Sequence, residues 1–333
     1  MPPSANVKAR SVEFSIDLPI GGDIIECAKT AERSDFGYAW IADSFNGDLF
    51  VTAARVARET TRIKLGLGNA NPYSRHPAII ALAAATLGEI SNGRIVLALG
   101  AGGPRQLTPI GIETWEKPLL TIREAVAVVR LLLSGGQSSY EGKIFRLRNA
   151  QLPFRISHKV PIYVSAIGPR MLELAGEVGD GVFIAGPPLK HIRNALDRIR
   201  KGANKSGNSP LIGIQVVYSP HMDDEHAKAA AKPVVGRMII PDGRFRSILK
   251  EIGISDAEIS NVTASLHGGP KAVANAVTDE MVQAFAIAGT PNSCVSQIKE
   301  YVAAGVDHIS LMPVGSFQDA VAITKKHVLP KVM

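Results

Sequence analysis

Few residues in this chain of 333 could build a disulfide framework or a metal centre. The two cysteines, Cys27 and Cys294, stand in helix-like runs and lack the spacing of metal ligands. This usage predicts two buried free thiols in a reducing compartment. The eight histidines lack metal spacing too, and the nearest pair, His221 and His226, brackets Met-Asp-Asp-Glu, which we interpret as an exposed helix start. We therefore expect no bound metal.

Long apolar segments are also missing. No run of eighteen apolar residues occurs, so no membrane-spanning helix is expected. The first fourteen residues, MPPSANVKARSVEF, contain no apolar core of the kind that secretory signals have. Both observations predict a cytoplasmic protein that does not contact a membrane.

Positive charge exceeds negative charge, with 37 Lys and Arg against 30 Asp and Glu, which gives a net charge of +7. The basic residues are spread along the chain, and the densest group, in residues 193–205, has no aromatic residues between its charges. We interpret that group as a solvated helix face and expect no nucleic-acid partner. A diffuse positive field favours anionic small molecules as partners.

Strand-like apolar runs alternate with helix-like runs from one end of the chain to the other. The strand-like runs are 11–17, 38–43, 62–68, 94–100, 161–166, 181–186, 211–219 and 307–315. Several of them are continuously apolar, as buried parallel strands are. Eight such β–α units in a chain of this length predict an α/β fold of the (β/α)₈ TIM-barrel type. We expect residues 1–333 to form a single domain.

Two segments interrupt the alternation. Residues 136–158 have the character of a small hairpin around Glu141–Gly142. About 85 residues separate the seventh and eighth strands, and we interpret about 220–305 as a mostly helical insertion on the barrel, with 265–273 as a loop inside it.

The carboxyl ends of the predicted strands are rich in glycine and poor in acids, bases and nucleophiles. Active sites of such barrels lie at these ends. The segment SAIGPRMLEL (165–174) is either an ordinary β–α turn or a phosphate site at a helix N-terminus. The main reactive side chains at these ends are Asp17, Asp43, Ser44 and Asp48. A reaction that depends on holding two rings face to face, such as hydride transfer, suits this composition.

Common catalytic motifs do not occur. The segment GAGGPR (100–105) fails the dinucleotide-binding pattern, because Arg105 stands where the third glycine would be. One unusual segment is GLGNANPYSRHP (66–77), which follows the third strand with two glycines, two asparagines and a proline before a helix opens at His76–Pro77. Its composition predicts that a flat group lies against the backbone there.

Five stretches resemble the luciferase-like superfamily of flavin and deazaflavin barrels. Within this superfamily the sequence is similar to the branch that uses coenzyme F420, an 8-hydroxy-5-deazaflavin. The methylenetetrahydromethanopterin reductases are the best-known members of that branch. The pattern NPYxRHPxxxAxxAATLxExSxGRxxLxLGAG, in residues 71–102, is the most specific part. The matching stretches are WIADSFNGD, residues 65–102, SYEGKIFRL, residues 161–186 and residues 288–315.

The resemblance implies roles for particular residues at the strand ends. The bulge that ends the third strand would support the deazaflavin ring from behind, with a non-prolyl cis peptide at Gly68–Asn69. Asp43 would contact the ring edge, and with Ser44 it would form the catalytic pair. The phosphate would bind at two turns. Their residues are Ser165, Ala166, Ile167 and Gly168 in one turn and Ala185 and Gly186 in the other.

Two departures from the family pattern bear on the reaction. Ser44 replaces the histidine that follows this acid in many relatives, and Gly103 replaces an acid that several reductases and dehydrogenases carry. Alcohol or sugar oxidation is therefore in doubt. We expect a deazaflavin-dependent oxidoreductase that transfers a hydride to a methylene-tetrahydropterin or a similar imine, because that transfer requires little proton movement.

Two other functions remain open at this point. One is a monooxygenase of the same fold that uses flavin mononucleotide (FMN), and the other is a non-catalytic flavin-binding protein. The helix-like run AIIALAAATLGEI carries more alanine and isoleucine than a fully solvated outer helix would, which predicts a homodimer or a higher homo-oligomer.

Overall fold

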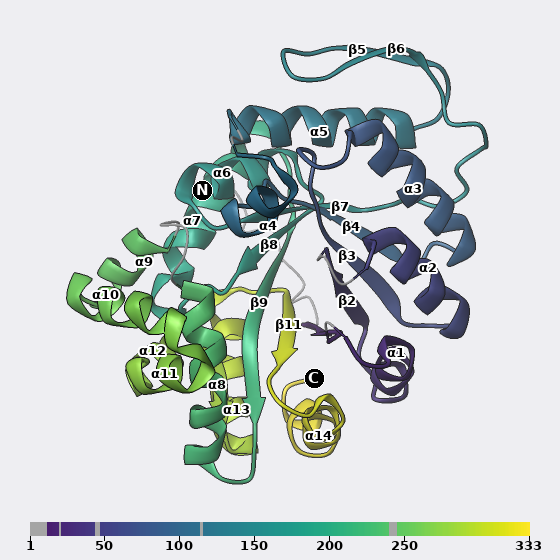
Figure 1. The fold of residues 1–333 in the computed structure, drawn as a ribbon. Helices are drawn as coiled ribbons and strands as arrows, with labels where there is room; N and C mark the ends of the chain where they lie inside the picture. Colours follow the sequence, from purple (N-terminus) through teal and green to yellow (C-terminus); the bar gives the residue numbers. More distant parts are fainter. Residues whose placement is uncertain (1–11, 20, 44–46, 114–115, 240–244) are drawn as a thin grey trace, which may run out of the picture.

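Eight parallel strands close into a barrel in the computed structural model of the protein (Figure 1), which describes residues 12–19, 21–43, 47–113, 116–239 and 245–333. Each strand pairs in parallel with the next, and the last pairs with the first, so that Glu13 lies opposite His308. The strands are β1 (Glu13–Asp17), β2 (Tyr38–Ala42), β3 (Lys64–Ala70), β4 (Ile95–Leu99), β7 (Ile162–Ala166), β8 (Gly181–Ala185), β9 (Leu211–Pro220) and β11 (His308–Pro313). The predicted TIM barrel is confirmed.

Helices surround the barrel and begin where the sequence supplies caps. The carboxylates of Asp23 and Asp48 accept backbone N–H groups at the starts of α1 and α2. Proline occupies the first turn of α3, α5, α6 and α13, where its missing N–H costs nothing. The outer helices are α1 (Ile24–Arg33), α2 (Leu49–Glu59), α3 (Pro77–Ile90), α5 (Pro118–Leu133), α6 (Pro169–Val178), α7 (Leu189–Ser206), α13 (Pro291–Ala304) and α14 (Phe317–Ile323); a short α4 (Pro104–Leu107) follows β4.

The expected hairpin is present as β5 (Ser138–Glu141) and β6 (Arg146–Ala150), paired antiparallel. It extends beyond α5 at the edge of the molecule (Figure 1). The buried Glu124 carboxylate of α5 accepts hydrogen bonds from the amides of Lys143, Ile144 and Phe145. One carboxylate thus fixes the tip of the hairpin to the outer helix.

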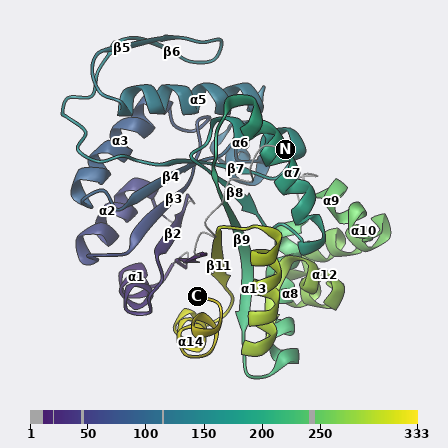
Figure 2. The same cartoon turned by 180° about the vertical axis from the view of Figure 1, so that it is seen from behind.

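The segment between β9 and α13 has its own hydrophobic cluster, built around residues such as Val235, Val262 and Phe285. Figures 1 and 2 both show its helices gathered on one side of the barrel, next to α7 and α13. Val217 of β9 belongs to the same cluster, which joins the segment to the barrel. Its elements are α8 (Asp224–Ile239), α9 (Arg246–Glu251), α10 (Asp256–Ser265), α11 (Gly269–Ala276), α12 (Asp279–Phe285) and β10 (Ala286–Gly289).

Two details of this segment differ from the sequence prediction. Residues 265–273 are not a loop, because Gly269–Pro270 opens α11 after one 3₁₀ turn (Leu266–Gly268). The strand β10 was not predicted, and it extends the pairing of β9 from Val217 to Pro220. Its four residues, Ala-Ile-Ala-Gly, are too few to show strand periodicity and follow directly on a helix.

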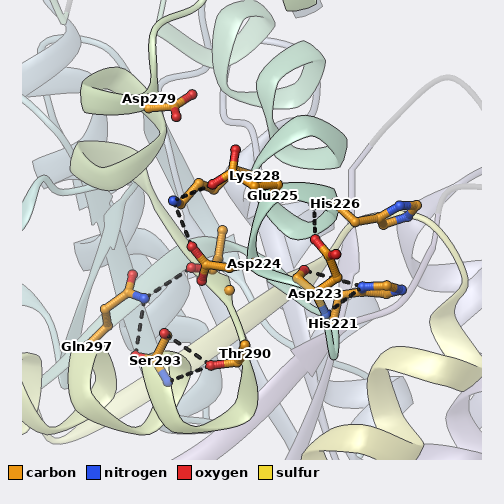
Figure 3. A network of polar contacts seen from close by, with 12 residues as sticks. His221, Asp223, Asp224, Glu225, His226, Lys228, Asp279, Thr290, Ser293 and Gln297 are labelled. Atoms are coloured by element: carbon orange, nitrogen blue, oxygen red, sulfur yellow. Dashed lines mark hydrogen bonds and ion pairs between the residues drawn. The ribbon is translucent and has the colours of Figure 1, made fainter.

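A polar network ties the start of α8 to the start of α13 (Figure 3). The Asp224 carboxylate lies 2.7 Å from Lys228 Nζ. The hydrogen bond from Lys228, together with bonds from Thr290 and Ser293 at the start of α13, lowers the pKa of Asp224. A carboxylate at a helix N-terminus is favourably placed. The network therefore holds the inserted helices against the helix that returns the chain to the barrel.

The same view shows that α8 begins as predicted. The rings of His221 and His226 stack 4.2 Å apart at its start, and the Asp223 carboxylate caps the amide of His226. Within the described ranges, no cluster of three or more potential metal ligands is present. No described helix is long and apolar enough to cross a membrane. The cytoplasmic location stays a prediction.

Candidate active site

The carboxyl ends of the parallel strands meet at one mouth of the barrel. Polar side chains from six strands or the turns just after them gather there. They are Asp17 of β1, Asp43 after β2, Asn69 of β3, Ser165 of β7, Gln215 of β9 and Ser310 of β11. Strand order alone places them around one rim, since β1, β9 and β11 are neighbours on one side and β3, β4 and β7 on the other.

The Gly68–Asn69 peptide bond is cis, as the resemblance implied. The pairing of β3 with β4 shifts register between Leu67 and Ala70, so the strand carries the expected bulge at this point. The carbonyl oxygen of Gly68 accepts a hydrogen bond from the Asp43 amide at 3.1 Å. The bulge therefore lies beside Asp43, where β2 and β3 end.

Asn69 and Ser165 meet on one side of the mouth. The Ser165 hydroxyl donates to the Asn69 side-chain oxygen, although 96 positions separate the two residues. This contact brings together one residue expected at the ring and one expected at the phosphate. Both side chains are half-buried, so each remains accessible to a bound molecule.

The turn after β7 has the geometry of an anion site. Gly168 is the N-cap of α6, and no side chain caps this end of the helix. A Cβ built on Gly168 would meet no atom within 4 Å, so space remains beside the free backbone N–H groups of the first turn. Ala166 is buried, and Ile167 packs against the inserted helices. These features fit a phosphate group.

The turn after β8 differs from the expectation. The Gly186 amide donates to the Gln215 carbonyl oxygen at 2.8 Å, so this N–H is already used inside the protein. A Cβ on Gly186 would lie 2.9 Å from the sulfur of Met238, which covers the turn from α8. The half-buried Ala185 precedes it. The prediction did not include this cover, because nothing in the local sequence shows which inserted helix lies over the turn.

Asp43 lies half-buried at the mouth, next to an ion pair between Arg75 and Asp48. Burial raises the pKa of Asp43, and the charge of Asp48 adds to this, while Arg75 opposes it. The Asp43 carboxyl group therefore lies near the positive charge of Arg75, but no described hydrogen bond joins the two side chains. Its predicted partner Ser44 lies outside the described residues.

Asp17 was noted among the strand-end acids but received no role in the sequence analysis. Its carboxylate accepts a 2.6 Å hydrogen bond from Ser310 Oγ and a second from the Gln215 side-chain amide. Burial raises the pKa of Asp17 to about 6, and the two hydrogen bonds limit the rise. The alternation of Glu13, Ser15 and Asp17 along β1, with polar residues on one face, was the signal for an inward-facing acid.

The glycines of β3 also make room for a side chain of the protein itself. A Cβ on Gly66 would lie 2.2 Å from the indole ring of Trp40, which fills the barrel interior and stacks on Phe183 at 4.4 Å. A Cβ on Gly68 would lie 3.1 Å from Ala98 Cβ and 3.3 Å from Trp40. At Gly66 the flat group against the backbone is therefore the protein's own tryptophan, and the role of Gly68 at the cofactor stays a prediction.

The mouth of the barrel thus combines a bulged cis peptide, a turn with space beside its backbone amides and two carboxyl groups of raised pKa, which suits a flat, phosphorylated cofactor. Comparison with known proteins agrees with this. The luciferase-like monooxygenase family pattern matches residues 18–308. The chain belongs to that family.

Individual relatives narrow the class. The chain is 38% identical over 315 residues to a 5,10-methylenetetrahydromethanopterin reductase of Archaeoglobus fulgidus, covering 91% of this chain and 94% of that protein. It is 25% identical to an F420-dependent glucose-6-phosphate dehydrogenase of Amycolatopsis mediterranei, over 93% of this chain and 94% of that protein. The solved coenzyme F420-dependent tetrahydromethanopterin reductase from Methanopyrus kandleri superposes with a TM-score of 0.89 and 30% identity, over 97% of this chain and 100% of that one. The expected enzyme class, an F420-dependent oxidoreductase, and its cofactor are confirmed at the level of this family branch.

Proposed function

We propose that the protein reduces a methylene-tetrahydropterin, in the manner of a methylenetetrahydromethanopterin reductase, with reduced coenzyme F420 as the hydride source. The observation that carries this is the Asp17 carboxyl group, which hydrogen bonds from Ser310 and Gln215 hold at the mouth of the barrel and whose pKa burial raises to about 6. The names and similarity of the relatives support the same substrate class. The bound coenzyme supplies a hydride, and every other function falls to residues of the chain.

The chemistry requires an acid, which changes the expectation that little proton transfer is needed. A methylene group bridging two amines accepts a hydride only after one C–N bond breaks to leave an iminium ion. That bond breaks readily when the departing amine nitrogen receives a proton. We assign this proton to Asp17, because a carboxyl group with a pKa of about 6 is still partly protonated near neutral pH and can act as a general acid.

The other mouth residues position the two reactants. We propose that Asn69 and the Gly68–Asn69 bulge support the deazaflavin ring, with Asp43 at its edge. The N–H groups at the start of α6 and the Ser165 hydroxyl would hold the phosphate. We keep the roles that the resemblance implies for the remaining residues. Ser44 would act with Asp43, and the two phosphate turns would include Ala166, Ile167, Ala185 and Gly186. We also propose that residues 1–333 form one barrel domain.

The assay follows oxidation of the coenzyme. Reduced coenzyme F420 is mixed with enzyme and methylenetetrahydromethanopterin or methylenetetrahydrofolate, and the visible absorbance of the oxidised deazaflavin is recorded. We expect turnover with at least one of these pterins. Tight coenzyme binding without turnover of either pterin would contradict the proposed substrate class. Turnover only with reduced FMN and oxygen would favour the monooxygenase, and binding without any turnover would favour the carrier protein.

The phosphate site can be tested without activity. Gly168 has φ −76° and open space around the missing side chain, so Gly168→Val should fold normally. The new side chain would fill the space intended for the phosphate, and we expect the Kd for coenzyme F420 to rise about tenfold to a hundredfold, which is about 1.4–2.8 kcal/mol. Isothermal titration measures this, with thermal unfolding as the folding check and Ser139→Ala in the hairpin as a distant control. Unchanged affinity would show that the phosphate binds elsewhere.

A homodimer formed through α3 is the second part of the proposal. Residues spaced along one side of α3 form an outward stripe, in which the Ile79 and Ile90 side chains are 52% and 42% exposed. The stripe consists of Ile79, Leu82, Ala83, Thr86 and Ile90. Apolar stripes of this kind commonly mark a protein interface.

We expect Ile79→Glu to convert the dimer into a monomer, because two buried carboxylates would face each other across a twofold axis. Light scattering at micromolar concentration measures the mass. Met222→Glu, at a position 67% exposed outside this stripe, is the matched control. A monomeric wild-type protein, or an unchanged dimer in the variant, would contradict the proposal.

A further inference from the structure

The interior of this barrel is unusually polar along one side. TIM-barrel interiors are filled mainly by branched apolar side chains. Here β1 and β11 carry hydrophilic residues on the inward face, and Ser15, His308 and Ser310 have no exposed surface. With Glu13 and Asp17 they form a polar column that runs from the N-terminal face of the barrel to its mouth.

Side-chain contacts are present at the mouth, in the middle and at the N-terminal end of this column. At the mouth, Ser310 Oγ donates to Asp17 Oδ1 at 2.6 Å. In the middle, Ser15 Oγ and His308 Nε2 are 2.8 Å apart. The register of β1 and β11 places Ser15 directly beside Ser310, on strands that lie about 4.8 Å apart.

At the N-terminal end, the Tyr38 hydroxyl hydrogen-bonds the Glu13 side chain and accepts a 3.1 Å hydrogen bond from Lys64 Nζ. The ring of Tyr38 lies against that of His308, with centroids 4.7 Å apart. Polar groups thus continue from Lys64, which is exposed, to the buried histidine. Among the described residues, no hydrogen bond joins Ser15 to Ser310 or joins His308 to Tyr38 and Glu13, so the column is interrupted at these two places.

Three buried polar atoms among the described residues have no partner in the protein. They are Glu13 Oε2, Trp40 Nε1 and His308 Nδ1. All three belong to the neighbouring strands β11, β1 and β2, and the Trp40 and His308 rings lie 6.2 Å apart. Buried polar atoms in native proteins are almost always satisfied, by ordered water where the protein provides nothing. Their grouping identifies a site for water inside the barrel.

A cavity of about 440 Å³ opens beside this site on the N-terminal face. Glu13 lines it, together with Phe14 and Gly37 at the starts of the first two strands. The cavity therefore brings solvent next to Glu13, at the lower end of the polar column and on the side opposite to the substrate.

We propose that ordered water held by Glu13, Trp40 and His308 completes a proton path, through Ser15 and Ser310, from this cavity to Asp17. The inference rests on the proposed role of Asp17 as the acid. When the mouth is covered by coenzyme and substrate, this path restores the proton that Asp17 has given up. No other entry from solvent is needed during the reaction.

The proton balance is simple. Asp17 gives one proton to the departing amine and becomes a carboxylate. Ser310 then passes its hydroxyl proton to Asp17 and takes one from Ser15 or from water, and the cavity supplies one proton in total. Burial, with Lys64 nearby, lowers the pKa of His308 to about 3, so the ring stays neutral and orients Ser15. His308 is a positioning residue.

The kinetic test removes one hydroxyl from the path. Ser15→Ala should leave coenzyme affinity unchanged but lower kcat by about tenfold and raise the solvent deuterium isotope effect on kcat, because proton return becomes limiting. Ser219→Ala is the matched control, since Ser219 is a buried barrel serine that donates to the Ala227 carbonyl away from the column. A wild-type rate and isotope effect in Ser15→Ala would overturn the path.

The structural test does not depend on the substrate. A crystal structure at high resolution should show water within hydrogen-bond distance of His308 Nδ1 and Trp40 Nε1. A dry interior would overturn the inference even if Asp17 proves to be the acid. If the wild-type enzyme turns over no methylene-tetrahydropterin, the proposed function fails, and the positions of the water molecules still decide whether the barrel is hydrated.

Discussion

Asp17→Asn is expected to lower kcat for methylene-tetrahydropterin reduction by about 10²–10⁴, the usual contribution of a general acid. The amide is similar in size and can keep a hydrogen bond with Ser310, so the coenzyme should bind as before. Because wild-type Asp17 must be protonated to act, its activity should fall as the pH rises above about 6. A pH profile of kcat measures both effects. An Asn variant with wild-type kcat, or a profile that stays flat between pH 5 and 8, would exclude this role.

The same substitution should change stability in a direction set by the raised pKa. A folded-state pKa of about 6 means that the fold favours the protonated form, so the stabilisation is present below the unfolded pKa of about 3.9 and is lost as the pH rises through 6. Asn has no charge to bury. We therefore expect Asp17→Asn to be more stable than wild type at pH 8, by up to about 3 kcal/mol, and no more stable at pH 4.

Thermal unfolding at the two pH values tests this prediction. Asp197→Asn is the control for loss of one negative charge, because its side chain is 71% exposed. An equal gain at both pH values would point to a general charge effect instead of a buried carboxylate.

Gly66→Ala is expected to destabilise the fold by about 3 kcal/mol, the upper part of the range for overpacked cores. The added methyl group would lie 2.2 Å from Trp40, and that indole is already held by Phe183 on its other side. The tryptophan would have to move within the layer that lies below the active site. We expect a lower Tm, changed tryptophan fluorescence and weaker coenzyme binding together.

Two comparisons separate this effect from a direct effect on the cofactor. Gly168→Ala adds the same methyl group where nothing lies within 4 Å, so its Tm should stay at the wild-type value. Trp40→Leu should remove most of the cost of Gly66→Ala, which a double-mutant cycle would show as coupling between the two positions. Additive effects of the two substitutions would mean that Gly66 is required for another reason.

Much of the fold could be predicted because it repeats. Each β–α unit carries its own pattern of buried strand and amphipathic helix, and each pattern is local, so eight units could be counted without knowing how they pack. The hairpin around Glu141 was predicted on the same basis. The short β10 was missed because four apolar residues carry too little periodicity, and only the free edge of β9 makes them a strand.

The parts of the site that depend on local sequence could be predicted. Residues at strand ends had to reach the mouth, and the resemblance supplied the cis bond at Gly68–Asn69, which the structure contains. The link between Asn69 and Ser165 could not be predicted, because two residues far apart in sequence meet only when β3, β4 and β7 lie side by side.

The sequence by itself determined the strands, the helices and the chemical character of each strand end, because those depend on neighbours within a few residues. Tertiary structure alone decided the state of the groups inside. Asp17 has its pKa of about 6 because closure of the barrel removes water from it, while Ser310 and Gln215, which closure brings to it from β11 and β9, limit the rise. Gly66 is needed because closure also brings Trp40 against it. Burial and contact between distant residues are properties of the closed barrel, and no single stretch of the chain contains them.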